Sequence, residues 1–215
     1  MMAVISAAFG SSILLLAFGF LDSIEAIVDF QYSKVMRSDY RLTFDSETDD
    51  RALREVRGLP GVVRAEPVLS IPCTFESLGA TKRGAITGIG ADAELLAPRD
   101  ADGRAVAVPF AGLLVAERMA ATLGLRAGDR VRVTPSRGER REFEAPVAGV
   151  IRSSVGLAVY ASREWLNRML GERGVLNGAE ILFRPGTYDA LRRAFLSSIV
   201  ERPEIGAVTD TSREK

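Results

Sequence analysis

The sequence predicts an α+β protein, and three observations support that class. Short runs in which apolar and polar residues alternate, such as 131–134, are typical of half-buried strands. Short amphipathic segments that stop at a glycine, such as 49–57 before Gly58, are typical of helices. The order strand, helix, strand occurs near both ends of the chain, and two such units pack readily as one sheet covered by helices.

Composition excludes several classes of protein. Of the 215 residues 47% are hydrophobic and 26% are charged, which is ordinary for a folded chain and argues against disorder. The 28 acidic side chains balance the 28 basic ones, so the basic excess that is usual in nucleic-acid binders is absent. The chain is long enough to bury a substantial core as one large domain or two small lobes.

The sequence contains no histidine and one cysteine, Cys73. Catalysis by Ser-His-Asp or Cys-His groups and zinc sites built from Cys and His are therefore excluded. No disulfide can form within the chain. Cys73 is expected to be a small buried apolar residue rather than a reactive thiol.

The first 21 residues are unusually apolar. They contain no charged side chain, and 16 of them are Ala, Val, Ile, Leu, Met or Phe. About twenty apolar residues span the ~30 Å hydrocarbon core of a bilayer as a helix. A signal peptide is disfavoured because no Lys or Arg precedes Lys34. We expect the end of a transmembrane helix here, with a buried core helix as the alternative.

The helical pattern continues beyond Asp22 in amphipathic form. Leu21, Ile24, Val28 and Tyr32 recur every three or four residues with charged residues between them, and neither Pro nor Gly occurs between residues 20 and 37. At ~1.5 Å per residue, a helix over residues 1–37 would be about 55 Å long. The sequence predicts a stalk that carries a folded domain away from a membrane.

The remainder is expected to form two lobes. Residues 38–70 and 177–215 would be the two halves of one lobe, and residues 71–176 an inserted, smaller α+β lobe. Each half is a strand, a helix and a strand: 40–44, 49–57 and 62–69, then 179–184, 188–201 and 202–209. The inserted part has mostly antiparallel strands at 84–90, 131–134, 141–150 and 156–160, with helices at 113–123 and 163–170.

This arrangement resembles the extracytoplasmic domain of MacB/FtsX-like permeases of ABC transporters. Residues 19–24 are similar to the outer end of the first membrane helix of that family, and residues 59–63 (LPGVV) to the turn after its first helix. The most specific stretch is 123–131 (LGLRAGDRV), similar to the family's "LG-x-x-x-GD-x-V" turn before a strand. Val150, Ile151, Gly156, Tyr160 and the helix that begins near Trp165 complete the likeness.

The resemblance implies a fold and a role. In that family two βαβ repeats form a porter-like lobe, and a second lobe is inserted between them. The expected partners are an ABC ATPase subunit, a second permease subunit in a dimer, and a periplasmic adaptor or cargo protein. The expected location is the bacterial inner membrane, with the folded domain on the periplasmic side.

No group of residues has the spacing of a catalytic or ligand site. The acidic cluster Asp45, Glu47, Asp49 and Asp50 lacks the central Gly and terminal Glu of an EF-hand, and is expected to be a helix start. Arg137, Arg140 and Arg141 alternate with glutamates at an expected hairpin tip. Neither a phosphate-binding loop nor a dinucleotide fingerprint is present. We expect no catalytic, cofactor-binding or metal-binding residues, and no enzymatic activity.

Two functions fit these expectations. In the first, the chain is the extracytoplasmic domain of a permease that couples cytoplasmic ATP hydrolysis to movement of a lipoprotein, lipid, peptide or drug. In the second, it is a membrane-tethered, FtsX-like binding or regulatory domain that recruits an envelope partner such as a cell-wall hydrolase. Both need the same membrane anchor and the same lobes, so the sequence does not separate them.

Overall fold

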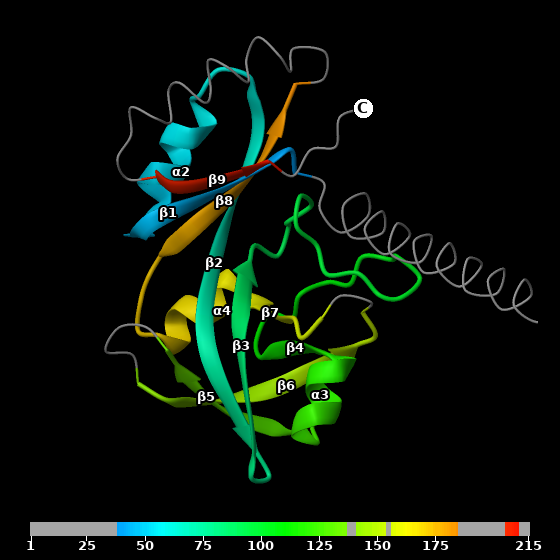
Figure 1. Cartoon of the computed structure of the whole chain (residues 1–215). Coiled ribbons are helices and arrows are strands. Elements are labelled where there is room, and N and C mark those ends of the chain that lie inside the picture. Colours follow the sequence, from blue (N-terminus) through cyan, green and yellow to red (C-terminus); the bar gives the residue numbers. More distant parts are fainter. Residues whose placement is uncertain (1–37, 137–140, 154–155, 185–204, 211–215) are drawn as a thin grey trace, which may run out of the picture.

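The computed structural model describes residues 38–136, 141–153, 156–184 and 205–210. In these residues nine strands form one continuous hydrogen-bonded sheet, and three short helices pack on it (Figure 1). The predicted α+β class is confirmed. The predicted stalk over residues 1–37 and the predicted helix at 188–201 lie outside the described residues. None of the helices in the described ranges is both long and apolar enough to cross a bilayer.

One part of the sheet is open and antiparallel, with the strand order β2-β8-β1-β9. Its strands are β1 (Tyr40–Thr48), the first half of β2 (Val62–Ser77), β8 (Leu176–Phe183) and β9 (Ile205–Asp210). Helix α2 (Asp50–Arg57) connects β1 to β2, and both of these strands run antiparallel to the β8 strand between them. This is the strand order of interlocked, ferredoxin-like βαβ units.

Helix α2 covers one face of the open sheet. Asp49 caps it, accepting a hydrogen bond from the Arg51 N–H at 2.8 Å, and its buried side chains are Leu53 and Val56. These two residues pack on alternate residues of the strands. The resulting core contains Tyr40, Leu42, Phe44, Ala65, Ala179, Ile181 and Phe183.

The other part of the sheet closes on itself. The second half of β2 pairs with β3 (Ala80–Ile89) and with β5 (Arg130–Pro135). From β3 the pairing continues through β7 (Val159–Ser162), β4 (Leu113–Ala116) and β6 (Phe143–Ile151) back to β5. These six strands form a small barrel, with helices α3 (Glu117–Leu123) and α4 (Arg163–Met169) against it. Side chains from every barrel strand fill a single core.

Strand β2 belongs to both parts. Its residues Val62–Val68 pair with β8, and its residues Cys73–Glu76 pair with β5. The domain boundary that the sequence suggested at residue 70 therefore falls inside one 16-residue strand. Figure 1 shows this strand running the length of the domain, with the open sheet at one end and the barrel at the other.

Two local predictions were wrong. Residues 113–123 were expected to be one helix, but the fully buried run Leu113–Ala116 is strand β4, held between β6 and β7. A short run that is apolar at every position fits a strand buried on both faces as well as a helix, and pairing decided between them. The acidic cluster was expected at a helix start, which holds for Asp49 and Asp50 in α2. It was wrong for Asp45 and Glu47, because β1 continues to Thr48, which pairs with Leu176 after a shift of register.

Candidate functional site

The point where the chain enters the fold is firmly held. The Asp39 N–H donates to the carbonyl of Ile181 at 2.8 Å, and the Asp39 carboxylate accepts the Phe183 N–H at 2.7 Å. Ser38, which is 4% exposed, donates its hydroxyl to the Glu180 carboxylate at 2.6 Å. The residues that follow the predicted stalk are therefore bonded directly to β8, through side chains as well as backbone.

The point where the chain leaves the fold lies beside the point where it enters. Tyr40 at the start of β1 pairs with Asp210 at the end of β9. When the two ends of a domain lie together at its surface, the domain can be inserted into a larger protein without disturbing its fold. The geometry thus suits a domain that interrupts another structure.

A line of four charged side chains, which we call the charge row, crosses the open sheet on the face opposite α2. It consists of Arg41 on β1, Glu180 on β8, and Glu66 and Arg64 on β2. Arg41 and Glu66 are the register partners of Glu180 on its two sides. The Arg41 Nε lies 2.5 Å from the Glu180 carboxylate, and the Arg64 Nε lies 2.5 Å from that of Glu66. Each buried carboxylate thus has its own arginine.

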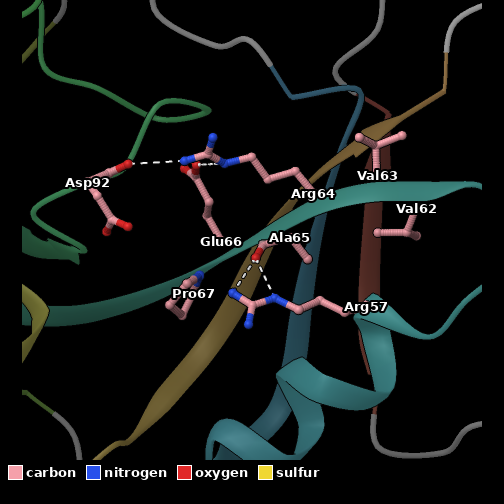
Figure 2. A pocket seen from close by; sticks show the side chains of 8 residues that line it. All are labelled: Arg57, Val62, Val63, Arg64, Ala65, Glu66, Pro67 and Asp92. Carbon is pink, nitrogen blue, oxygen red and sulfur yellow. Dashed lines mark hydrogen bonds and ion pairs between the residues drawn. The ribbon is translucent and has the colours of Figure 1, made fainter.

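The Glu66 end of the charge row holds the loop that follows β3. The Glu66 carboxylate, which is 9% exposed, accepts the N–H groups of Glu94 and Leu95 at 2.9 to 3.1 Å. Arg64 donates to the carbonyl of Asp92 at 3.1 Å (Figure 2). It also donates to the Glu94 carboxylate at 2.8 Å. Beneath these bonds Leu96 packs on Val68 and Ile89. We call this set of contacts the Glu66 clasp.

Two buried or half-buried asparagines hold the connections between the open sheet and the barrel. The side-chain amide of Asn177 accepts the Ser70 N–H and donates to the Ser70 carbonyl, both at 2.8 Å. The amide of Asn167 on α4 does the same for Val175, at 3.0 and 3.1 Å. Each asparagine acts in place of a backbone partner, so the backbone N–H and carbonyl of Ser70 and of Val175 are both hydrogen-bonded.

Replacing Asn177 by alanine should lower the free energy of unfolding by about 2 kcal/mol, because the Ser70 N–H and carbonyl lose their partners where β2 passes from sheet to barrel. Urea unfolding followed by the fluorescence of the single tryptophan, Trp165, measures the change. The variant Asn177→Asp is a second test of the same bonds, since aspartate keeps the acceptor for the Ser70 N–H but has no donor for the Ser70 carbonyl. It should also destabilise the fold, and wild-type stability in both variants would contradict the bridging role.

A salt bridge also joins helix α4 of the barrel to helix α2 of the open sheet. Arg163 donates through Nη1 to the Asp50 carboxylate at 2.8 Å, and the Arg163 side chain is 12% exposed. Asp50 lies in the first turn of α2, where a carboxylate also interacts favourably with the helix dipole. Together with β2 and the two asparagines, this pair fixes the barrel on the sheet.

Tyr160 on β7 has a raised pKa because burial disfavours the phenolate, and the positive charge of Arg41 opposes part of that rise. An acid whose pKa is higher in the folded than in the unfolded state stabilises the fold below the unfolded pKa of about 10. That stabilisation is lost as the pH rises through the folded-state value.

The variant Tyr160→Phe should therefore lose less stability than the wild type between pH 9 and pH 11, because phenylalanine has no proton to release. Urea unfolding at several pH values across this range, read by Trp165 fluorescence, measures the difference between the two proteins. A difference that does not change with pH would show that Tyr160 titrates alike in the folded and unfolded chains.

The residues considered as candidate sites from the sequence do not come together as a site. Of the acidic cluster, Asp49 caps α2 and Asp50 pairs with Arg163, while Asp45 and Glu47 are exposed on β1. In the described part of the chain no group of three or more acidic or cysteine side chains is placed to hold a metal ion. Arg141 is exposed, and Arg137 and Arg140 lie outside the described residues.

Two local features predicted from the sequence are present in the structure. Cys73 is buried, 1% exposed, in the barrel core, and its thiol donates to the Ile71 carbonyl at 3.2 Å. In the turn 123–131, Gly128 has a backbone φ of +96°, a value that residues other than glycine rarely adopt. The Asp129 carboxylate accepts the Arg126 N–H at 2.7 Å and so closes the turn. This motif builds structure, as expected.

Sequence reasoning missed the charge row and the two asparagines. A signal for the charge row was present, because each glutamate has apolar neighbours in its strand: Glu66 lies between Ala65 and Pro67, and Glu180 between Ala179 and Ile181. A glutamate in such a place is buried at high cost unless a cation and hydrogen-bond donors surround it. The donors come from residues far along the chain, so the partners could not be identified from spacing.

The fold defined by these contacts, an open βαβ sheet joined by one strand to a small barrel, occurs in transporter domains of known structure. The extracellular domain of the noncanonical ABC-type transporter YknZ from Gram-positive bacteria superposes with a TM-score of 0.51 and 14% identity, over 80% of this chain and 98% of that domain. The periplasmic region of MacB from Actinobacillus actinomycetemcomitans gives a TM-score of 0.50 and 10% identity, over 86% and 94%. Comparison with protein-family models and with curated protein sequences finds no match.

The chain therefore has the fold of the MacB-like extracytoplasmic domain of ABC transporter permeases. The resemblance read from the sequence is confirmed at the level of the fold. At 10 to 14% identity the likeness concerns the fold, so the role of the domain is argued separately below.

Proposed function

We propose that the chain is the extracytoplasmic domain of an ABC transporter permease subunit and transmits the effect of cytoplasmic ATP hydrolysis to a substrate or partner in the cell envelope. The observation that carries the proposal is the shared fold, which extends over 98% of the YknZ extracellular domain. The location follows from the same likeness: the folded part would lie on the outer side of the inner membrane.

The chain ends support this proposal. Tyr40 and Asp210 lie side by side, as a domain inserted between two membrane helices requires. Residues 1–21 contain no charged side chain and have the composition of a membrane helix. Neither Pro nor Gly occurs between residue 20 and Ser38, so the sequence contains no helix breaker before the folded part. The expected partners are an ABC ATPase subunit, a second permease subunit and a periplasmic adaptor or cargo protein.

The contacts of the folded part support transmission as a rigid body. Ser38 and Asp39 bond the start of the domain to β8, so a displacement of residue 38 acts on the centre of the open sheet. Strand β2, the two asparagines and the Arg163–Asp50 pair then connect that sheet to the barrel. A helix that continues into such a body can act as a lever, which a flexible linker cannot do. The proposal includes no enzymatic step.

The lever can be tested in the intact parent protein, purified with its ATPase subunit in lipid nanodiscs. A spin label on the variant Ala127→Cys, at an exposed position of the barrel end, reports the distance between two copies by pulsed electron spin resonance. Native Cys73 is buried and should not be labelled. We expect the distance distribution to change when ATP is bound, and the change to disappear when Asp22, Ser23 and Ile24 are replaced by three glycines.

Replacement of the same three residues by alanines is the matched control, because each alanine favours the helix by about 1 kcal/mol over glycine. The alanine variant should keep the ATP-dependent change. A change that survives in the glycine variant would refute the lever while leaving the transporter class intact. Failure of any ATPase subunit to associate would contradict the class itself and favour a tethered domain that recruits an envelope partner.

A further inference from the structure

We propose that Arg57 protects a free edge of strand β2 from pairing with the same strand of a second copy of this chain. The edge in question runs from Val63 to Pro67, at the end of the domain where β2 belongs to the open sheet. The inference concerns association between copies of the chain and does not depend on the transporter function proposed above.

The direction of the backbone groups identifies the free edge. The backbone N–H and carbonyl of Ser70 bond to Asn177 beside β8, and the Pro72 carbonyl accepts the Ser136 N–H beside β5. Even-numbered residues of β2 therefore face the edge shared by β8 and β5. In a strand the backbone groups of alternate residues point to opposite edges, so the odd-numbered residues face the β3 side.

Strand β3 covers only part of that side. Its last residue in the ladder, Ile89, pairs with Val68, and the chain then turns away into the loop held by Glu66. The backbone groups of Ala65 and Pro67 consequently face an edge along which no strand of the described ranges pairs. Free edges of this kind invite pairing with another chain.

Three features of this edge oppose such pairing. Pro67 has no N–H to donate, and proline is typical of edge strands. The register of β2 against β8 shifts between Val62 and Arg64, a bulge that twists the strand locally. The Arg57 side chain donates from Nε and Nη2 to the Ala65 carbonyl at 3.1 and 3.0 Å (Figure 2).

Arg57 is the feature that occupies a backbone group directly. It comes from the last turn of α2 and reaches the strand from the side opposite Arg64, as Figure 2 shows. A hollow of about 410 Å³ lies along the same residues of β2. Beside it Val63 is 58% exposed, so an incoming strand would find an apolar side chain as well as backbone partners once Arg57 withdrew.

The occupant that the edge must exclude is a second copy. Two identical edges can pair antiparallel about a twofold axis, each supplying the groups that the other needs. Any assembly that holds two copies together raises their effective concentration to the millimolar range, at which weak edge pairing becomes populated. An arginine over the central carbonyl removes one acceptor from each edge without adding a clash that would strain the fold.

The test compares the association of the full chain in detergent for the wild type, Arg57→Ala, Pro67→Val and the double variant. Arg54→Ala is the matched control, because Arg54 lies one turn earlier on the exposed face of α2. Sedimentation equilibrium gives the association constant, and hydrogen exchange of residues 62–67 locates the contact. We expect the double variant to associate about 10-fold more tightly than the wild type, as one or two added backbone hydrogen bonds would produce, with slower exchange at Ala65.

Two results would overturn the proposal. The first is that Arg57→Ala, Pro67→Val and the double variant all associate with the same constant as the wild type and Arg54→Ala. The other is tighter association without slower exchange at residues 62–67, which would place the contact elsewhere. Pro67→Val changes the strand and not the helix, so it tests the edge even if loss of Arg57 lowers the stability of α2.

Discussion

Replacement of Glu180 by alanine is expected to lower the free energy of unfolding by about 3 kcal/mol, at the lower end of the range for breaking a buried ion pair. The Glu180 side chain is fully buried, while its partner Arg41 is 33% exposed and can recover part of its hydration. Loss of the carboxylate leaves the Ser38 hydroxyl without its acceptor and Arg41 without its counter-charge. Urea unfolding with Trp165 fluorescence measures the effect.

The position of the probe makes this measurement informative about the whole domain. Trp165 lies in the barrel and Glu180 in the open sheet, so the fluorescence registers the loss only if both parts unfold together. A two-state transition shifted to lower urea would show that they do. If circular dichroism reports an earlier transition than Trp165, the sheet and the barrel unfold separately.

Two further variants separate the buried pair from a general effect of lost charge. Glu76→Ala removes a 49% exposed carboxylate that lies 3.8 Å from Arg132 and should change stability by less than about 0.5 kcal/mol. In the double variant Arg41→Ala with Glu180→Ala, the losses should not add, because each single variant leaves an unpartnered group that the double variant lacks. Strict additivity would contradict a direct interaction between Arg41 and Glu180.

The second large effect is expected at the Glu66 clasp. Glu66→Ala should lower the free energy of unfolding by about 3 kcal/mol, because two backbone N–H groups and Arg64 lose a nearly buried carboxylate. Amide exchange should accelerate most at Glu94 and Leu95, whose N–H groups donate to it. Hydrogen exchange measured by NMR would resolve these two amides from the rest of the loop.

Glu94→Ala is the control for the clasp. That variant removes a carboxylate that is 68% exposed and bonded to Arg64, but it leaves the backbone N–H bonds of residues 94 and 95 to Glu66 intact. Its effect on stability should be below about 1 kcal/mol. If Glu94→Ala accelerates exchange in the loop as much as Glu66→Ala does, Arg64 and not Glu66 holds the loop.

The sequence correctly predicted those helices and turns whose signals come from residues close together in the chain. Helices were predicted at 49–57 and 163–170, where α2 and α4 lie. Both have local capping residues: Asp49 caps α2, and the Ser162 hydroxyl accepts the Trp165 N–H at the start of α4. The turn at Gly128 was identified in the same way, because its geometry requires a glycine followed by a short polar side chain. Each of these signals lies within a few residues of the structure that it predicts.

Pairings between distant parts of the chain could not be predicted. The sequence indicated strands near residues 62–69 and 84–90, but not that β2 continues to Ser77 and pairs with three other strands. Strand β4 depends on partners 34 and 44 residues away, as the pairs Leu113 with Val147 and Val115 with Val159 show. Alternation of side chains gives the faces of a strand but not its neighbours.

The candidate site depended most strongly on such distant contacts. Glu180 meets Ser38 across 142 positions, and Arg41 across 139. A buried carboxylate in a strand is a recognisable anomaly, yet its meaning depends on which cation reaches it. The sequence could therefore indicate the fold of a MacB-like extracytoplasmic domain by resemblance, whereas the contacts that hold the domain together could be identified only from the structure.

The shared strand β2 limits how domains of this fold could be recombined. A chimaera joined at residue 70 would take the two halves of strand β2 from different parents. The half that pairs with β8 in the open sheet and the half that pairs with β5 in the barrel would then no longer come from one native strand. Cuts before Ser38 and after Asp210 would sever no described pairing and would transplant the domain whole. Exchange of such domains between proteins, in the laboratory or in evolution, should therefore succeed with cuts beside Ser38 and Asp210 and fail with a cut near residue 70.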